Sequence, residues 1–595
     1  AMAAAGTMAL AFGGQRPAGA SAVSCSHQSG DTIKDFVGAS GGAFGEASNW
    51  SPVGVPDATS IVCVPAGKTV NVTNGVQVAG INVAGGLHVD AGVGLTVQGT
   101  GASVPSTVAS GGIIHDLDLD GVLAGSAAVD LTGTVDLRSG SVRGPGTRTV
   151  VSGATAQLGG SGWIGGDGAA AELVIAGTAT AGSGGDVFVA GEARLVVASG
   201  GRLVLTATDG SSIRSAGWSP SIHVLAGGTI ERTGGGEGSV LAVPIDNDGT
   251  VLASGGDLVV QGQSPEGTSD GGTWRATLGT IRLQASRALG PGAAVTGANG
   301  LQVEAGTLST PTAQGTQMSR LMVRGARLTG SQTISSSLIL VDGASLDDTG
   351  TTTIASSATG TIAAVDVRNG HVLENAGSLT WAGQYFRACS GGLVDNRAGG
   401  ALYLAEPAGY GLDSCESPAG RVLNRSGATV VKVSSTATTL SVPFDNDGDV
   451  QVAEGLLTVT APGSAGSAGD SGSWRSLAGG TLDFSVGAER RFDGGSIGGT
   501  GTTNFSGGSF TGTPQIQKLT WRGGTFSGAG PATVTGSLTT EGSVLLAGHL
   551  VNRGSLTWPG NGQIIVGDGA ELRNGSGGTL LITDSIAVFK DSGVE

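Results

Sequence analysis

One stretch of the sequence occurs twice, and this duplication limits the possible folds more than any other feature. Residues 228–249 read GTIERTGGGEGSVLAVPIDNDG, and residues 427–448 read GATVVKVSSTATTLSVPFDNDG. The copies align without a gap, because Pro244 and Pro443 lie 199 positions apart (443 − 244). Further on, GGTWR in the first copy corresponds to GSWR in the second, with one residue inserted between the copies. Such internal similarity predicts a repeat architecture.

A shorter unit recurs inside the duplication and beyond it: an apolar run, an asparagine, a glycine soon after, and then an alternating strand. The asparagines are Asn247, Asn375, Asn396, Asn424, Asn446, Asn552 and Asn574. Their spacing is 21 (396 − 375) or 22 (446 − 424 and 574 − 552) where the unit is regular. This period fits one coil of a β-solenoid, whose successive coils lie about 4.8 Å apart. Asn and Gly suit a corner because both tolerate positive φ, and an Asn amide can also bond to the next coil. Hairpin turns in an antiparallel sandwich are the alternative interpretation.

Composition agrees with strands and turns. Glycine accounts for 112 of 595 residues, more than twice its usual share of roughly 7%. Segments such as INVAGGLHVDAGVGLTVQG, residues 81–99, alternate apolar and polar residues with glycine between the runs, which favours strands. We therefore predict an all-β fold: an elongated parallel β-helix (β-solenoid) with an N-terminal cap and loop insertions.

The chain divides into five expected parts. Residues 1–22 are small and apolar and end in Ala-Ser-Ala, which is typical of a secretory signal peptide whose charged start is missing. A flexible tail is the alternative. Residues 23–66 form the expected cap, because an open β-stack otherwise presents unpaired backbone groups. Three solenoid runs follow at residues 67–243, 244–442 and 443–595.

Four cysteines fall into two local pairs, Cys25 with Cys63 and Cys389 with Cys415. An even number of cysteines behind a signal-like segment favours disulfides over metal binding, and proximity selects this pairing. Free buried thiols are the alternative. Disulfides and a signal peptide together predict a secreted or cell-surface protein.

The segment NWSPVGVPDATSIVCVPAGKTVNV, residues 49–72, resembles the opening of bacterial extracellular β-helix proteins. The repeats resemble those of adhesin-like or autotransporter-passenger-like surface proteins, and the likeness covers most of the chain. The shared motifs are structural and carry no catalytic residue. Phe36, Phe44 and Trp50 are suited to cover the first coil.

One acidic cluster is the candidate chemical site. In IIHDLDLDG, Asp116, Asp118 and Asp120 alternate with leucines, which predicts that they share the outward face of one strand. A row of carboxylates can bind calcium, and pectate-lyase-like enzymes use such a groove on a parallel β-helix with a basic residue as proton acceptor. A solvated strand face is the competing interpretation. We expect no catalytic residue and, calcium apart, no cofactor.

Charge and hydropathy limit the partners. The net charge is −16, so nucleic acid is not an expected partner, and no apolar run is long enough to insert in a membrane. Glycine- and serine-rich loops at residues 264–274 and 462–474 are where solenoids carry binding function. The sequence thus predicts a structural or adhesive solenoid that binds a host or environmental surface, a glycan or a protein. The alternative is a β-helical polysaccharide lyase or glycoside hydrolase acting on an acidic glycan.

Overall fold

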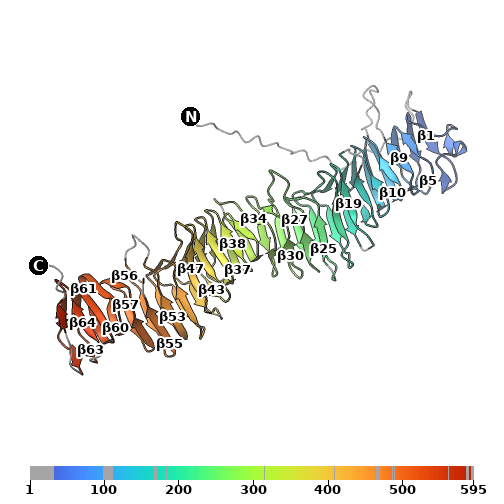
Figure 1. Ribbon diagram of the computed structural model, residues 1–595. Helices are drawn as coiled ribbons and strands as arrows, with labels where there is room; N and C mark the ends of the chain where they lie inside the picture. The colour runs from blue at the N-terminus through green and yellow to red at the C-terminus, as the bar shows by residue number, and fades with distance from the viewer. Residues whose placement is uncertain are drawn as a thin grey trace, which may run out of the picture. The chain divides into compact units, whose positions relative to one another are not determined.

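The computed structural model is nearly all β-structure, with 57% strand and 1% helix. It forms a parallel β-solenoid of about 23 turns, which confirms the predicted fold class. The chain divides into two compact units, Ala1–Val243 and Pro244–Glu595, each a stack of coils (Figure 1). The structure describes residues 32–97, 111–166, 170–182, 184–236, 238–313, 315–407, 409–463, 469–485, 487, 489–559, 562–583 and 588–590.

In the regular coils three short parallel strands make one coil, and each strand pairs with the strand three places later in the chain. Where one long strand covers two faces, as β10 (Gly111–Leu119) and β37 (Gln332–Val341) do, the partner lies two places later. Two successive coils of the first unit consist of β17 (Glu172–Ile175), β18 (Thr178–Ala181), β19 (Val187–Ala190), β20 (Arg194–Val197), β21 (Arg202–Leu205) and β22 (Ser212–Ala216). Two coils of the second unit consist of β42 (Val372–Asn375), β43 (Ser378–Trp381), β44 (Phe386–Cys389), β45 (Leu393–Asn396), β46 (Ala401–Leu404) and β47 (Gly411–Cys415). Each strand has only four or five residues, so a coil presents three narrow outward faces.

The core of each coil is filled by every second side chain of its strands. In β17, Leu173 and Ile175 are completely buried, whereas Glu172 and Val174 point outward. Leu173 pairs with Leu195 of the next coil, so identical positions stack along the interior. This period of two is the alternation seen in the sequence, and burial of these columns supplies the main stabilising free energy.

The start of the described chain covers the first coil. Here β1 (Thr32–Phe36), β2 (Gly42–Ala43), a 3₁₀ helix (Ala47–Asn49) and β3 (Trp50–Ser51) precede β4 (Ser60–Val64) and β5 (Thr69–Val72). β1 pairs with β4 and β2 pairs with β5, so backbone groups at this end of the stack are bonded. The rings of Phe36 and Phe44 lie 5.3 and 4.8 Å from that of Trp50, and all three side chains are buried. The Trp50 indole donates a 2.7 Å hydrogen bond to the carbonyl of Phe44.

The recurring asparagines each end a strand, and all but Asn574 are buried. Amide groups of Asn375, Asn396 and Asn424 each donate to the side-chain oxygen of the asparagine one coil on, at 2.8, 2.9 and 2.8 Å, ending at Asn446. These four asparagines are at most 1% exposed, and we call them the asparagine ladder. A stack of identical amides lets each amide pair with the next one inside an apolar core, and only the side-chain oxygen at the start of the ladder, in Asn375, has no partner among the described residues.

The other three asparagines occupy related places. Asn552 donates to Asn574 at 2.7 Å near the end of the second unit, and Asn574 is exposed. Asn247 is completely buried, and its backbone N–H donates to Asp270 at 3.0 Å.

Cys389 and Cys415 form a disulfide that joins β44 to β47, with 4.6 Å between their Cα atoms. Cys63 is buried in β4, but its expected partner Cys25 and the expected signal segment 1–22 lie outside the described residues. That pairing therefore stays a prediction. Among the described residues, no helix is long and apolar enough to span a bilayer.

Candidate functional site

All three aspartates of the acidic cluster are exposed and alternate with the buried Leu117 and Leu119. Asp116 and Asp118 belong to β10 (Gly111–Leu119), and Asp120 follows its last residue; β10 pairs through its first half with β7 (Gly80–Val83) and through its second half with β8 (Gly86–Val89). The change of partner occurs at Asp116, whose φ is +54°. A side-chain oxygen of Asp116 accepts a 2.8 Å hydrogen bond from the backbone of Thr134. Asp116 therefore stabilises the corner at which the strand changes partner.

Asp118 and Asp120 lie instead beside His88 of the preceding coil. The ligand atoms of these three residues lie within 4.8 Å of one another. Each ring nitrogen of His88 already faces a carboxylate: Nδ1 lies 2.9 Å from Asp118 and Nε2 lies 3.0 Å from Asp90. His88 is thus held between two carboxylates on an open strand face.

The basic residue of this region is also paired. Arg138 forms an ion pair with Asp136, two positions earlier in the chain, with 2.5 Å between Nη2 and Oδ2. Hydrogen bonds from Arg138 lower the pKa of Asp136. His115 faces the Thr132 hydroxyl at 3.0 Å. The Asp136 carboxylate raises the pKa of Arg138, so the guanidinium stays protonated and cannot accept a proton from a substrate.

This set of side chains fits calcium poorly. Ca²⁺ takes six to eight oxygen ligands, whereas Asp90, Asp118 and Asp120 surround an imidazole. A histidine with carboxylates is closer to the donor set of zinc or another transition metal. A metal would have to break the contacts of His88 with Asp90 and Asp118. The geometry is that of a network in which His88 offsets the negative charges of the carboxylates around it.

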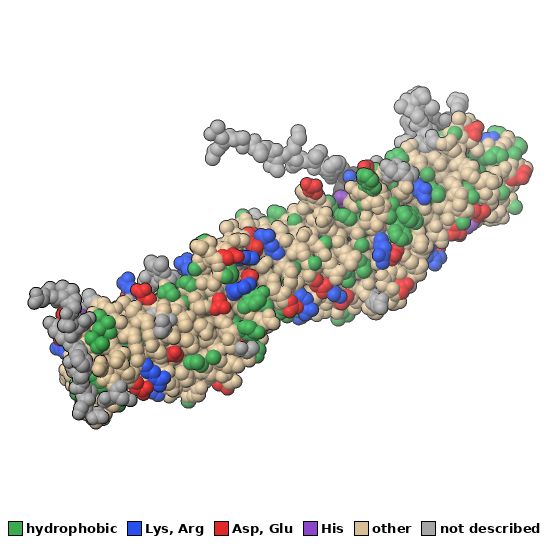
Figure 2. All heavy atoms as spheres, viewed as in Figure 1, with side chains coloured by type: hydrophobic (Ala, Val, Ile, Leu, Met, Phe, Trp, Pro, Cys, Tyr) green, Lys and Arg blue, Asp and Glu red, His purple; other side chains and the backbone are tan. Residues whose placement is uncertain are grey.

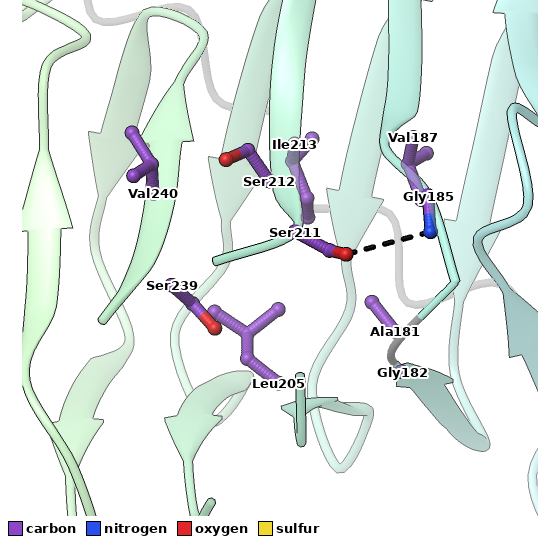
Figure 3. A pocket seen from close by; sticks show the side chains of 10 residues that line it. All are labelled: Ala181, Gly182, Gly185, Val187, Leu205, Ser211, Ser212, Ile213, Ser239 and Val240. Carbon is purple, nitrogen blue, oxygen red and sulfur yellow. Dashed lines mark hydrogen bonds between the residues drawn. The ribbon is translucent and has the colours of Figure 1, made fainter. Parts of the chain in front are cut away.

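A cavity in the first unit lies between the coils of β18–β19 and β21–β22 (Figure 3). Its volume is about 10 Å³, room for about one water molecule. The Ser211 hydroxyl accepts a 3.4 Å hydrogen bond from the Gly185 backbone at its wall. The buried Ser239 hydroxyl has no hydrogen-bond partner among the described residues, which is the environment of a structural water. The cavity is too small to admit a sugar unit.

A buried ion pair that the sequence analysis missed fixes the loop at residues 264–269. Arg287 donates to Asp270 at 2.5 to 2.8 Å, and both side chains are completely buried. The same guanidinium donates to the carbonyls of Gly262 and Ile245 at 3.0 and 2.7 Å and lies 4.8 Å from the centre of the Trp274 ring. The loop therefore rejoins the stack at Asp270, which the buried Arg287 holds in place.

The second copy of the duplication repeats this arrangement. Arg490 donates to Asp470 and to the carbonyl of Phe444, and its guanidinium lies 4.9 Å from the centre of the Trp474 ring. A side-chain oxygen of Asp470 accepts from the backbone of Asn446 at 2.9 Å, as Asp270 does from Asn247. We call these two arrangements the buried pins. The loop that corresponds to residues 264–269 includes residues 464–468, which lie outside the described residues.

The sequence contained a signal for the pins. Each copy has an aspartate four residues before its tryptophan, in DGGTW and DSGSW. Both tryptophans are at most 1% exposed. The arginines follow at different distances, so alignment of the copies alone would not have paired them with the aspartates.

On the face seen in Figure 2, acidic and basic side chains are interspersed in small groups. This distribution gives no continuous basic track of the kind that binds a phosphate backbone. No protein-family model matches the chain, and no curated protein matches it.

Proposed function

We propose that the protein is a secreted or cell-surface adhesive β-solenoid that presents binding loops on a rigid body and catalyses no reaction. The buried pin at the base of the 264–269 loop carries this proposal. Glu266 and Gly267 at the loop tip are exposed, while Asp270 at its base is bonded to Arg287 in the core. A loop held in this way loses little conformational freedom on binding, so more of the contact free energy is retained as affinity.

The disulfide supports the proposed location. Cys389 and Cys415 are bonded, and structural disulfides persist in oxidising compartments outside the cytosol. The partners we propose are a host or environmental surface, a glycan or another protein. The net charge of −16 argues against nucleic acid, since a polyanion would be repelled.

A loop exchange tests the proposal. Residues 264–269 are replaced by a Gly/Ser segment of equal length, and binding to a glycan array and to immobilised extracellular proteins is compared with that of the native chain. We expect at least one native interaction to weaken tenfold or more. Glu192→Ala, in an exposed turn of the first unit, is the matched control and should bind as the native chain does. Equal binding by the loop exchange at every ligand would refute loop display.

The second candidate function is a lyase or hydrolase acting on an acidic glycan. The proximity of His88, Asp118 and Asp120 favours it. An imidazole beside two carboxylates could donate a proton to, or accept one from, the same substrate atom. Exposure of the cluster and the pairing of Arg138 with Asp136 argue against it. Release of unsaturated or reducing sugars from polygalacturonate would support this second function.

A further inference from the structure

One outward face of the second unit carries no ionised side chain over five successive coils. It is formed by the second half of β37 (Gln332–Val341), by β40 (Thr359–Ile362), β43 and β46, and by β49 (Thr429–Lys432). Two residues of each strand point outward. The ten residues of this neutral face are Ser337, Ile339, Thr359, Thr361, Ser378, Thr380, Ala401, Tyr403, Thr429 and Val431.

The ten side chains form two straight columns. Ser337 pairs with Thr359, and that column continues through the next coils to Thr429. Ile339 pairs with Thr361, and the second column continues in the same register to Val431. All ten are partly or fully exposed. Four steps of the coil spacing give a length of roughly 19 Å at about 4.8 Å per step, and the columns lie about 6.7 Å apart.

Neighbouring faces of the same coils differ in charge. Asp366 and Arg387 form an ion pair at 2.7 Å on one side, and Glu374 pairs with Arg397 near the other. Charged side chains are therefore present in these coils but stay off the neutral face. A charged partner docked there would lose water without gaining a counter-charge, which is costly. An uncharged partner avoids this penalty.

Hydroxyl groups of the neutral face are available for a partner. Those of Thr361, Ser378, Thr380 and Thr429 make no hydrogen bond to any described residue, and that of Thr359 reaches only the Ser336 carbonyl at 3.5 Å. A hydroxyl both donates and accepts, so a column of them can pair with hydroxyls of either orientation. Half-exposed Tyr403 beside small Ala401 adds an apolar ring with a polar end.

The asparagine ladder holds this face in place from inside the core. The amide of Asn375 donates to the carbonyl of Ala401 at 3.0 Å, and that of Asn396 donates to the carbonyl of Thr429 at 3.0 Å. These two ladder residues thus each fix the first residue of a strand on the neutral face. A surface ordered before binding loses little entropy when it meets a regular partner.

We infer that the neutral face binds an extended, uncharged polysaccharide along the coil axis. Sugar hydroxyls pair with the serine and threonine columns, and the apolar side of a sugar ring packs on Tyr403 and its aliphatic neighbours. A repeating, neutral, hydroxyl-rich chain is the partner whose chemistry matches a repeating, neutral, hydroxyl-rich surface. This site is separate from the 264–269 loop, so it goes beyond the proposed function.

Charge insertion tests the inference. Binding of the full chain to cellulose, chitin and a soluble neutral β-glucan is measured by depletion and by affinity electrophoresis, with polygalacturonate as the charged probe. We expect binding to at least one neutral polymer and none to polygalacturonate. The double variant Thr361→Lys/Thr380→Lys and the single variant Tyr403→Ala should each weaken neutral binding at least tenfold. Thr333→Lys, an outward residue of β37 on a neighbouring face, is the matched control and should bind as the native chain does.

Each other outcome overturns the inference. The inference is wrong if the native chain binds no neutral polymer, or if the face variants bind as well as the native chain. It is also wrong if Thr333→Lys loses as much binding as the face variants do. Inhibition of ice recrystallisation without polysaccharide binding would assign the face to ordered water and would also refute the proposal. Circular dichroism checks that each variant is folded. Loss of binding in the loop exchange but not in the face variants would leave the proposed function standing and refute this inference alone.

Discussion

Arg287 and Asp270 form a bidentate ion pair with no exposed side-chain surface, and Arg490 repeats the contact with Asp470 in the second copy of the duplication. Arg287 also bonds two backbone carbonyls and Arg490 bonds one, and each aspartate accepts from a backbone N–H. These contacts satisfy polar groups that burial would otherwise leave without partners. The duplicated sequence thus encodes a duplicated anchor for a loop.

The first prediction concerns this anchor. Arg287→Ala should lower the free energy of unfolding by about 3–5 kcal/mol, because it leaves a buried carboxylate without its partner. Replacing both partners, as in Arg287→Met/Asp270→Leu, should recover much of that loss. Arg138→Ala removes an exposed pair, which solvent screens, and should cost far less than Arg287→Ala. Denaturant unfolding followed by circular dichroism measures all three, and equal costs for Arg287→Ala and Arg138→Ala would contradict the assignment.

The asparagine ladder makes a second prediction. Asn396→Ala should destabilise the second unit by about 1–3 kcal/mol, since the amide of Asn375 and the carbonyl of Thr429 lose a partner inside the core. Asn574→Ala, at an exposed position, is the control and should cost much less. Faster hydrogen exchange in the coils around β45 would locate the effect, and unchanged exchange there would show that the ladder adds no stability.

A third prediction uses pH. His371 is completely buried, with ring nitrogens 2.9 Å from the Thr352 hydroxyl and 3.1 Å from Asp348. Burial lowers its pKa below the usual value, and the contact with Asp348 and the charge of Asp347 only partly oppose this. The unfolded chain therefore binds a proton more readily, so stability should fall as pH drops below about 6.5, by at most about 1.4 kcal/mol per pH unit. His371→Gln should flatten this dependence in thermal unfolding between pH 8 and pH 5. A native curve that is flat over that range would contradict the prediction.

The fourth prediction concerns the disulfides. Peptide mapping without reductant should recover Cys389 linked to Cys415, and Cys63 linked to Cys25. Reduction of the first bond frees a loop of 26 residues and should cost about 3 kcal/mol on the loop-entropy estimate. Recovery of Cys63 as a free thiol would refute the second pairing.

The fold could be predicted from the sequence because its signals are local and repeated. An inward asparagine such as Asn396 must recur once per coil to meet the next one, so the coil length is written in the spacing of the asparagines. The acidic cluster could not be predicted in the same way. Alternation predicted that Asp116, Asp118 and Asp120 face outward, and all three are exposed. It gave no sign of the left-handed conformation at Asp116, where the strand changes its partner from β7 to β8, because a bend of one residue interrupts no hydropathy pattern.

The contact between Asp118 and His88 could not be predicted from the sequence either. His88 lies 30 residues earlier in the chain (118 − 88), and only the register of β8 against β10 brings the two together. Register between coils depends on how many residues each corner uses, and those numbers vary in the first unit. The neutral face could not be predicted either. Its ten residues are spread over nearly a hundred positions, and only the register between coils brings them together.

We expect this solenoid to bind its partners without transforming them. The most direct measurement incubates the purified chain with polygalacturonate and with neutral β-glucan, with and without calcium, and follows unsaturated products and new reducing ends. We predict no product above a buffer control, and no difference between the native chain and Asp118→Ala. A calcium-dependent release of unsaturated sugars that disappears in Asp118→Ala would contradict the claim and identify the His88–Asp118–Asp120 cluster as a catalytic site.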